Sequence, residues 1–203
     1  MERRKSRFEE AREILLKHGG VIRTGEALEA GIHPATLYEM RDSGVIERLS
    51  RGVYRLADIP PLGNPDLVSV AVRAPGSVTC LISALAFHEI TLEVPHAVHI
   101  AIGRTMRPPR IDYPPVRVFR YSSASFESGI ETHELDGVSV RIFSPEKTIA
   151  DCFRYRNKIG ADVAVEALRM YAERPRRDLA AIAEFARLCR VESVMRPYLE
   201  AVL

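Results

Sequence analysis

The sequence predicts an α+β protein, with an N-terminal winged helix-turn-helix followed by an α+β domain that has a small mainly antiparallel sheet and C-terminal helices. Residues 8–44 have helical apolar spacing interrupted by glycines, and residues 45–57 change to β-favouring side chains. A run rich in proline follows at residues 60–65, where helix is disfavoured. We therefore expect a first domain at residues 1–60 and a second at residues 61–203.

The first domain is expected to contain three helices. Residues 8–18 place apolar side chains three and four positions apart, which is typical of an amphipathic helix. After a short extended piece, Thr24 can cap a second helix, and Gly31 can supply the left-handed backbone of a sharp turn. Pro34 suits the start of a third helix over residues 34–43, because no amide partner is needed there. These features predict a helix, a tight turn and a helix.

A β-hairpin is expected directly after the third helix. Residues 45–57 are rich in β-favouring and apolar side chains, and Leu49-Ser50-Arg51-Gly52 offers a turn between two short strands. A small helical bundle with an incidental hairpin is the alternative. The winged interpretation is favoured because turn chemistry, helix lengths and hairpin coincide.

The second domain is expected to combine helices with a four-stranded sheet. Helices are predicted at residues 66–73 and 79–90, from Ser144-Pro145-Glu146, and from residue 161 nearly to the C-terminus. Strands are predicted at residues 97–102, 116–121, 130–135 and 138–143. Asp136-Gly137, between the last two strands, is a strong hairpin signal.

Composition restricts the class of protein. The 203 residues are 46% hydrophobic and carry a formal charge of +2, from 29 basic and 27 acidic side chains, so an anionic partner must be met by a local patch. The three cysteines are odd in number and lack C-x-x-C spacing, which is typical of reduced thiols in a cytoplasmic protein. The basic start Arg3-Arg4-Lys5 leads into no apolar signal core, and no run is long enough to span a bilayer. We therefore expect neither export nor a membrane partner.

The third helix and the hairpin carry the candidate DNA contacts. In a helix-turn-helix the second helix enters the major groove, and here Leu37 and Met40 form its inward side. Thr36 and Tyr38 are the favoured groove contacts, whereas His33 is as readily a helix cap as a contact. Cations around the hairpin could clamp phosphates. The candidate DNA-binding residues are Thr24, His33, Thr36, Tyr38, Arg41, Arg48, Arg51 and Arg55.

The charge balance of the first domain argues against a strongly basic, nonspecific binder. Residues 1–60 contain 11 Lys or Arg and 10 Asp or Glu. Two basic clusters follow in the second domain, and each could extend a DNA footprint or be a solvated face. The first cluster comprises Arg104, Arg107, Arg110, Arg117 and Arg120, and the second comprises Arg154, Arg156, Lys158, Arg174, Arg176 and Arg177.

Catalytic and metal motifs have little support in the sequence. His96 and His99 stand three apart in an extended run, which sends them to opposite faces of a strand. Ser83, His88 and Asp151 have the residue types of a catalytic triad. The triad is disfavoured because no G-x-S-x-G surrounds Ser83, and Ser83 and His88 face apart on one predicted helix. A phosphate-binding G-x-x-x-x-G-K-[ST] is also absent. We expect no enzymatic activity and no cofactor.

Three segments, in this order, resemble the AbiEi-type antitoxin family of transcriptional regulators. They are "GIHPATLYEMRDSGVIERLSRGVYRL", "TCLISALAFHEI" and "SPEKTIADCFRYRNKIGADVAVEALRMY". The resemblance implies a protein that binds inverted repeats of double-stranded DNA in its own promoter and represses cooperatively. It also implies that the second domain counteracts a nucleotidyltransferase-like toxin in the type IV manner, without a stable complex. The protein would act as a monomer or weak dimer.

Two other functions remain open from the sequence alone. The first is a ligand-responsive winged-helix repressor whose second domain senses a small molecule, which effector-dependent release of DNA would support. The second is a nuclease or nucleotidyltransferase tethered to a DNA-binding module, which the missing motifs disfavour.

Overall fold

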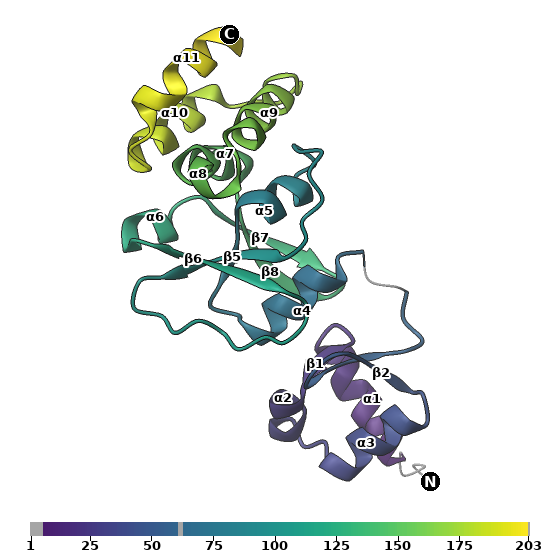
Figure 1. The fold of residues 1–203 in the computed structure, drawn as a ribbon. Coiled ribbons are helices and arrows are strands. Elements are labelled where there is room, and N and C mark those ends of the chain that lie inside the picture. The colour runs from purple at the N-terminus through teal and green to yellow at the C-terminus, as the bar shows by residue number, and fades with distance from the viewer. Residues whose placement is uncertain (1–5, 61–62, 203) are drawn as a thin grey trace. The chain divides into compact units, whose positions relative to one another are not determined.

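The computed structural model describes residues 6–60 and 63–202 (Figure 1). The chain divides into two compact units. The first comprises Met1–Pro75, Pro109–Pro114 and His133–Val140, and the second comprises Gly76–Pro108, Pro115–Thr132 and Arg141–Leu203. Pro61 and Leu62, at the predicted domain boundary, and Arg3, Arg4 and Lys5 lie outside the described residues.

The first unit contains the predicted winged helix-turn-helix. Its elements are α1 (Arg7–Lys17), β1 (Val21–Arg23), α2 (Thr24–Glu29), α3 (Pro34–Asp42), β2 (Ile46–Ser50), β3 (Val53–Leu56) and α4 (Pro65–Arg73). The strands form an antiparallel sheet in the order β1-β3-β2. Gly31 has a φ of 95°, the left-handed backbone that the sequence predicted, and Gly44, which follows α3, also has a positive φ of 75°.

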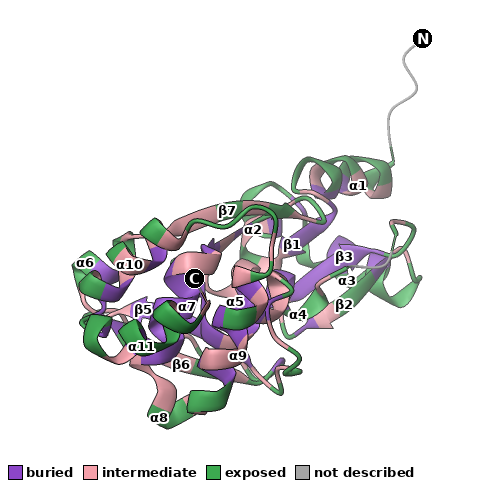
Figure 2. Ribbon diagram, turned by 90° about the horizontal axis from the view of Figure 1, so that it is seen from above, coloured by how far each residue is buried: buried purple, intermediate pink, exposed green. Residues whose placement is uncertain are grey.

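An apolar core joins the three helices to this sheet. Leu15 of α1, Leu37 and Met40 of α3, and Leu56 of β3 are all fully buried. The whole of β3 is coloured as buried in Figure 2. The prediction that Thr24 caps α2 is wrong. Arg23 occupies the cap position, and the Thr24 backbone N–H instead donates to the Gly52 carbonyl at 2.9 Å. Thr24 therefore ties the start of α2 to the hairpin turn.

The remaining elements belong wholly or in part to the second unit. They are β4 (Val78–Thr79), α5 (Leu81–Phe87), β5 (Val98–Gly103), β6 (Val116–Tyr121), α6 (Ser123–Glu127), β7 (Ile130–Leu135), β8 (Val138–Phe143), α7 (Pro145–Arg154), α8 (Arg156–Ile159), α9 (Ala161–Ala172), α10 (Leu179–Leu188) and α11 (Glu192–Val202). The four predicted strands are confirmed, and Asp136 and Gly137 form the turn with φ of 51° and 75°.

The sheet has one more strand than predicted, and its order is β6-β5-β4-β8-β7. The added strand, β4, takes Thr79 out of the helix predicted at residues 79–90, and α5 begins only at Leu81. β4 pairs antiparallel with β5 but parallel with β8, and β5 pairs parallel with β6. The α+β class is confirmed, with a sheet that mixes both kinds of pairing.

Helix α7 lies at the centre of the second unit. It packs against α5, α9 and α10, and in Figure 1 both α5 and α7 lie on one face of the sheet. Ser144 caps α7 by accepting from the Lys147 backbone N–H at 3.3 Å, with Pro145 in the first turn, as predicted. Ile149, Cys152 and Phe153 lie in the apolar core, and the polar residues Lys147, Thr148 and Asp151 of the same helix are buried as well, so α7 is enclosed on all sides over these residues.

A buried ion pair also lies on α7. Lys147 and Asp151 have no exposed side-chain surface, and the Lys147 ammonium donates to Asp151 Oδ2 while resting over the Tyr121 and Phe143 rings. The Cys189 thiol donates to Asp151 Oδ1 at 3.2 Å. Burial raises the pKa of Asp151, and the bonds from Lys147 and Cys189 oppose that rise. Both carboxylate oxygens are therefore held inside the core.

Candidate nucleic-acid interface

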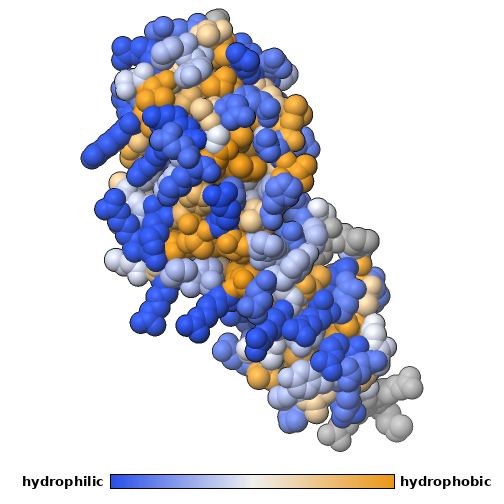
Figure 3. Space-filling view, viewed as in Figure 1, coloured by the Kyte–Doolittle hydropathy of each residue, from blue (hydrophilic) through white to orange (hydrophobic). Residues whose placement is uncertain are grey.

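Helix α3 is positioned by one buried stripe. Leu37 and Met40 are completely buried in the first unit's core, as the sequence predicted. His33, Ala35, Tyr38 and Glu39 are exposed on the other side of the helix. Hydrophilic side chains predominate on the face of this unit seen in Figure 3. The helix thus offers a free outer surface of the kind that enters a major groove.

Thr36 does not belong to that surface, which corrects its expected outward position. It is only 5% exposed. Thr36 and Met40 are four residues apart and lie on the same side of the helix as Leu37, so the helical period itself turns Thr36 inward. The outward position was predicted because the threonine side chain is polar.

The exposed side chains of α3 are oriented by local contacts. His33 Nδ1 accepts from the Ala35 backbone N–H at 3.2 Å, so His33 is the helix cap. The Arg41 guanidinium lies 5.2 Å from the centre of the exposed Tyr38 ring and donates to Asp42 at 2.8 Å. The hydrogen bond to Asp42 raises the pKa of Arg41. Tyr38 is therefore held as an exposed aromatic platform beside a cation.

A cation from α1 joins this surface. Arg7 Nη2 lies 2.5 Å from Glu39 Oε2, and both side chains are largely exposed. The pair compensates the acidic charge that α3 would otherwise present to a phosphate backbone. Arg7 was not among the predicted contacts, because its proximity to Glu39 depends on how α1 packs across α3.

The hairpin between β2 and β3 presents two exposed arginines. Arg48 Nε donates to the Ser50 carbonyl at 3.2 Å, and the Arg51 side chain is 78% exposed. Asp112 lies 3.8 Å from the Arg51 guanidinium, at the outer limit of an ion pair. These cations are accessible for the phosphate contacts that the sequence predicted.

Helix α4 fastens the hairpin turn, a feature that the sequence analysis missed. The Ser69 hydroxyl donates to the Ser50 hydroxyl at 2.9 Å, and Arg73 donates to the Arg51 carbonyl at 2.9 Å. Val68 packs on the sheet next to Val53. The signal was present in the spacing of Ser69 and Arg73, which are four residues apart and share one side of α4.

Arg55 is corrected from a surface cation to a structural one. It lies on β3, the central strand of its sheet, and is 7% exposed. Its guanidinium donates to Glu47 at 2.5 Å and to the carbonyls of Ile59 and Pro60 at 2.6 and 2.8 Å. Thr24 is likewise occupied, since its hydroxyl lies 3.4 Å from the Gly52 carbonyl. Arg55 therefore has little capacity left for a phosphate.

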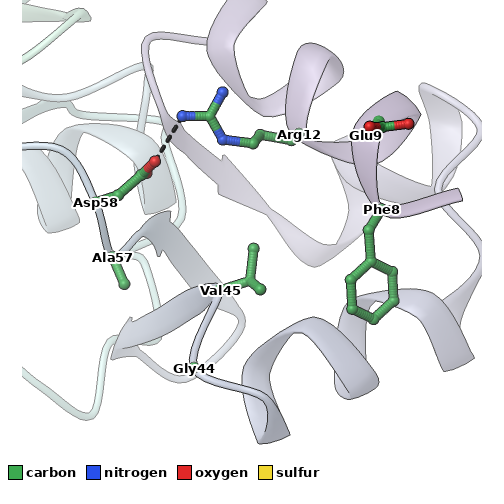
Figure 4. A pocket seen from close by; sticks show the side chains of 7 residues that line it. All are labelled: Phe8, Glu9, Arg12, Gly44, Val45, Ala57 and Asp58. Atoms are coloured by element: carbon green, nitrogen blue, oxygen red, sulfur yellow. Dashed lines mark hydrogen bonds and ion pairs between the residues drawn. The ribbon is translucent and has the colours of Figure 1, made fainter. Parts of the chain in front are cut away.

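A hollow of about 530 Å³ lies elsewhere on the first unit, between α1, the turn after α3 and the end of β3 (Figure 4). Phe8, Val45 and Ala57 give it an apolar lining. Its charges are engaged, because Arg12 pairs with Asp58 at 2.6 Å and Glu9 accepts from the Ser6 backbone N–H. The hollow therefore adds no free cation to the interface.

The candidate triad of the second unit is not assembled. The Ser83 hydroxyl lies between the Ala97 carbonyl and the His99 N–H, His88 contacts the Phe143 carbonyl, and Asp151 is sealed in the core. Within residues 6–60 and 63–202, no cluster of three His, Cys, Asp or Glu side chains could hold a metal ion. None of the helices in these ranges is both long and apolar enough to cross a membrane.

Comparison with known proteins supports a regulatory role for the winged region. Residues 9–57, which run from α1 to the end of β3, match the family model described as a transcriptional regulator, AbiEi antitoxin. This match confirms the family resemblance for that part of the chain. The search of curated proteins returned no match.

The fold also has a counterpart among solved structures. The crystal structure of the Rv2827c protein from Mycobacterium tuberculosis is similar over 98% of this chain and 83% of that chain, with a TM-score of 0.52 and 16% sequence identity. At this identity the likeness concerns the fold alone, and it extends the similarity beyond the winged region.

Proposed function

We propose that the protein is a sequence-specific autorepressor, which binds inverted repeats in its own promoter and serves as the antitoxin of an AbiEi-type system. The observation that carries the proposal is the exposed surface formed by α3, with Tyr38 and the stacked Arg41, on the unit that also exposes Arg48 and Arg51. The match of residues 9–57 to a family of transcriptional regulators supports the same assignment.

The exposed residues divide into two proposed roles. Tyr38, with His33 at the helix start, would contact base edges, because the first residues of a recognition helix reach deepest into the groove. Arg48 and Arg51 would bind phosphates and fix the protein's register on the duplex. With so few free cations, affinity would depend on two copies occupying the two half-sites of an inverted repeat.

Fluorescence anisotropy with a labelled duplex from the upstream region tests these roles. The Arg48→Ala/Arg51→Ala protein should bind all duplexes more weakly, and the slope of log affinity against log salt should fall by about two. Tyr38→Ala should instead weaken binding to the promoter duplex more than to a scrambled duplex. Arg12→Ala is the matched control, since it removes an arginine whose guanidinium already pairs with Asp58.

Unchanged affinity and salt slope in the double variant, with circular dichroism like the wild type, would contradict the wing contacts. Equal losses on promoter and scrambled duplexes would contradict the base-reading role of Tyr38. If the wild type itself does not distinguish the two duplexes, the autorepressor proposal fails.

The antitoxin role is proposed for the second domain and needs a separate test. Co-expression with a nucleotidyltransferase-type toxin from the same operon should restore growth, and the two proteins should elute separately in size-exclusion chromatography. The Arg48→Ala/Arg51→Ala protein, expressed from an unrelated promoter, should protect as well as the wild type. Failure of the wild type to restore growth would contradict the antitoxin proposal without affecting the DNA-binding one.

A further inference from the structure

A second cavity, of about 520 Å³, lies entirely within the second unit. Arg104 from the turn after β5, Arg154 from the end of α7, and Arg190 from beyond α10 line it. Ser122, just before α6, adds a hydroxyl, and Ala124 and Leu188 add apolar surface. Its volume falls within the range of about 300–1,000 Å³ that is usual for small-molecule sites.

The cavity is strongly positive. Its lining has three arginines and no carboxylate. Among the described residues, none of these arginines forms an ion pair with a carboxylate. Asp151, which bonds the lining residue Cys189, is already paired with Lys147 and completely buried. The charge of Arg154 also acts on Asp151, but that carboxylate bonds Lys147 and Cys189, so in the described part of the chain the three arginines keep their hydrogen-bond donors free of carboxylate partners.

The backbone that carries two of the arginines is set by local structure. The Arg120 guanidinium donates to the carbonyls of Arg104 and Met106 at 2.7 and 2.9 Å, which fixes the turn carrying Arg104. Arg190 has φ of 58°, at a helix-end position where glycine is the usual residue. An arginine would be retained at this strained position if its guanidinium binds a ligand in the cavity.

We propose that this cavity binds a small phosphorylated molecule of nucleotide size. Guanidinium groups present paired N–H donors that match phosphate oxygens, and three of them can neutralise more than one phosphate. The apolar surface of Ala124 and Leu188 suits the uncharged part of such a ligand. A concave pocket of this volume also favours an enclosed ligand over the phosphate backbone of a duplex, which is contacted from exposed surfaces.

The site is one for binding, and its thiol is not a nucleophile. Burial, followed by the charge of Asp151, raises the pKa of Cys189 to about 12. The thiol therefore stays protonated at neutral pH and serves as a hydrogen-bond donor to Asp151. The inference is independent of DNA binding by the first unit.

Isothermal titration calorimetry of the full chain tests the proposal, with pyrophosphate and each of the four ribonucleoside triphosphates as probes. At least one probe should bind saturably with one site per chain. Arg190→Gly and Arg154→Gln should each weaken that binding about tenfold, the effect of losing one charge-assisted contact. Arg190→Gly should fold normally, because glycine accepts the left-handed backbone. Arg187→Ala, at the same helix end but not on the cavity lining, is the matched control.

Absence of binding by all five probes at millimolar concentration would overturn the proposal. Equal weakening by Arg187→Ala and Arg190→Gly would also overturn it, because it would indicate a diffuse charge effect. A further titration measures the binding of a 20-base-pair duplex to the wild type and to Arg190→Gly. If Arg190→Gly weakens duplex binding while leaving nucleotide binding unchanged, the arginines contact DNA phosphates and the small-molecule assignment is wrong.

Discussion

The two units hold their charged groups in opposite ways. Lys147 and Asp151 of the second unit form an ion pair with no exposure to solvent. In the first unit, the ion pairs formed by Arg7, Arg12, Arg41, Arg51 and Arg55 each leave at least one partner exposed. A buried charge that loses its partner has no water to solvate it, whereas exposed pairs are broken at little cost. Surface charges of the winged unit can therefore exchange partners at little cost. Removing one charge of the internal pair of the second unit should instead lower the stability of the fold.

The largest expected effect comes from breaking the buried pair. Asp151→Ala should lower the free energy of unfolding by about 3–5 kcal/mol, because Lys147 would be left buried and unpaired. The double variant Lys147→Met/Asp151→Leu should lose much less, since it removes both charges and keeps an apolar core. Urea denaturation followed by circular dichroism measures both. Equal losses in the two proteins would show that the charge pair is not the cause.

A cavity in the winged core should have the next largest effect. Leu37→Ala should cost about 2–5 kcal/mol of unfolding free energy, because Leu37 is fully buried beneath α3. Tyr38→Ala, one residue along, should leave the unfolding temperature nearly unchanged, because its ring is 45% exposed. Differential scanning calorimetry of the two proteins compares the inner and outer sides of one helix. Similar losses in both would contradict the orientation of α3.

A pH-dependent loss of stability is expected from His99. Burial, and then the charge of Arg117, lowers the pKa of this 4%-exposed histidine from 6.5 to about 4. The unfolded chain therefore takes up a proton below pH 6.5 that the folded chain refuses until about pH 4, and stability falls as the pH is lowered through that window. Over this window the loss should be about 3 kcal/mol, at about 1.36 kcal/mol for each pKa unit.

The His99 contribution is measured as a difference between two proteins, because carboxylates titrate in the same range. Urea denaturation of the wild type and His99→Gln at pH 7, 6, 5 and 4 isolates it. The variant should lose less stability than the wild type on acidification. Parallel curves would assign the acid sensitivity to other groups.

The smallest effect is expected at the exposed pair of Arg12 and Asp58. The hydrogen bond from Arg12 lowers the pKa of Asp58 below its ordinary value of 3.8. The pair's small contribution to stability is therefore present above that value, and is lost as the pH falls through the lower pKa of the folded state. An NMR titration of the Asp58 carboxyl, repeated in Arg12→Ala, should show the pKa returning toward 3.8. An identical titration in both proteins would exclude the coupling.

Much of the fold was predictable because local signals agreed with the final packing. Gly31 tolerates the left-handed backbone of a tight turn, Pro34 fixes its own φ near a helical value, and the helices that they delimit appear as expected. Asp136-Gly137 specified a hairpin for the same reason. The two-residue strand β4 escaped prediction because its pairing partners lie far away in sequence, in β5 and β8.

The candidate interface was less predictable, because exposure depends on tertiary packing. Thr36 and Arg55 have polar side chains that suggested a surface location, yet the helical period buries the first and the central strand buries the second. Arg7 became a neighbour of Glu39 only through the packing of α1 on α3. The three-arginine cavity also required the fold, since Arg104, Arg154 and Arg190 are distant in sequence.

All three cysteines of the chain lie in the second unit and are buried. Burial raises the pKa of Cys80 and Cys152 well above the ordinary range, as it does for Cys189. Alkylation by iodoacetamide requires the thiolate, so the native protein should react slowly. Mass-spectrometric counting of carbamidomethyl groups would then report opening of the second unit alone, because the winged unit contains no cysteine that the reagent could alkylate.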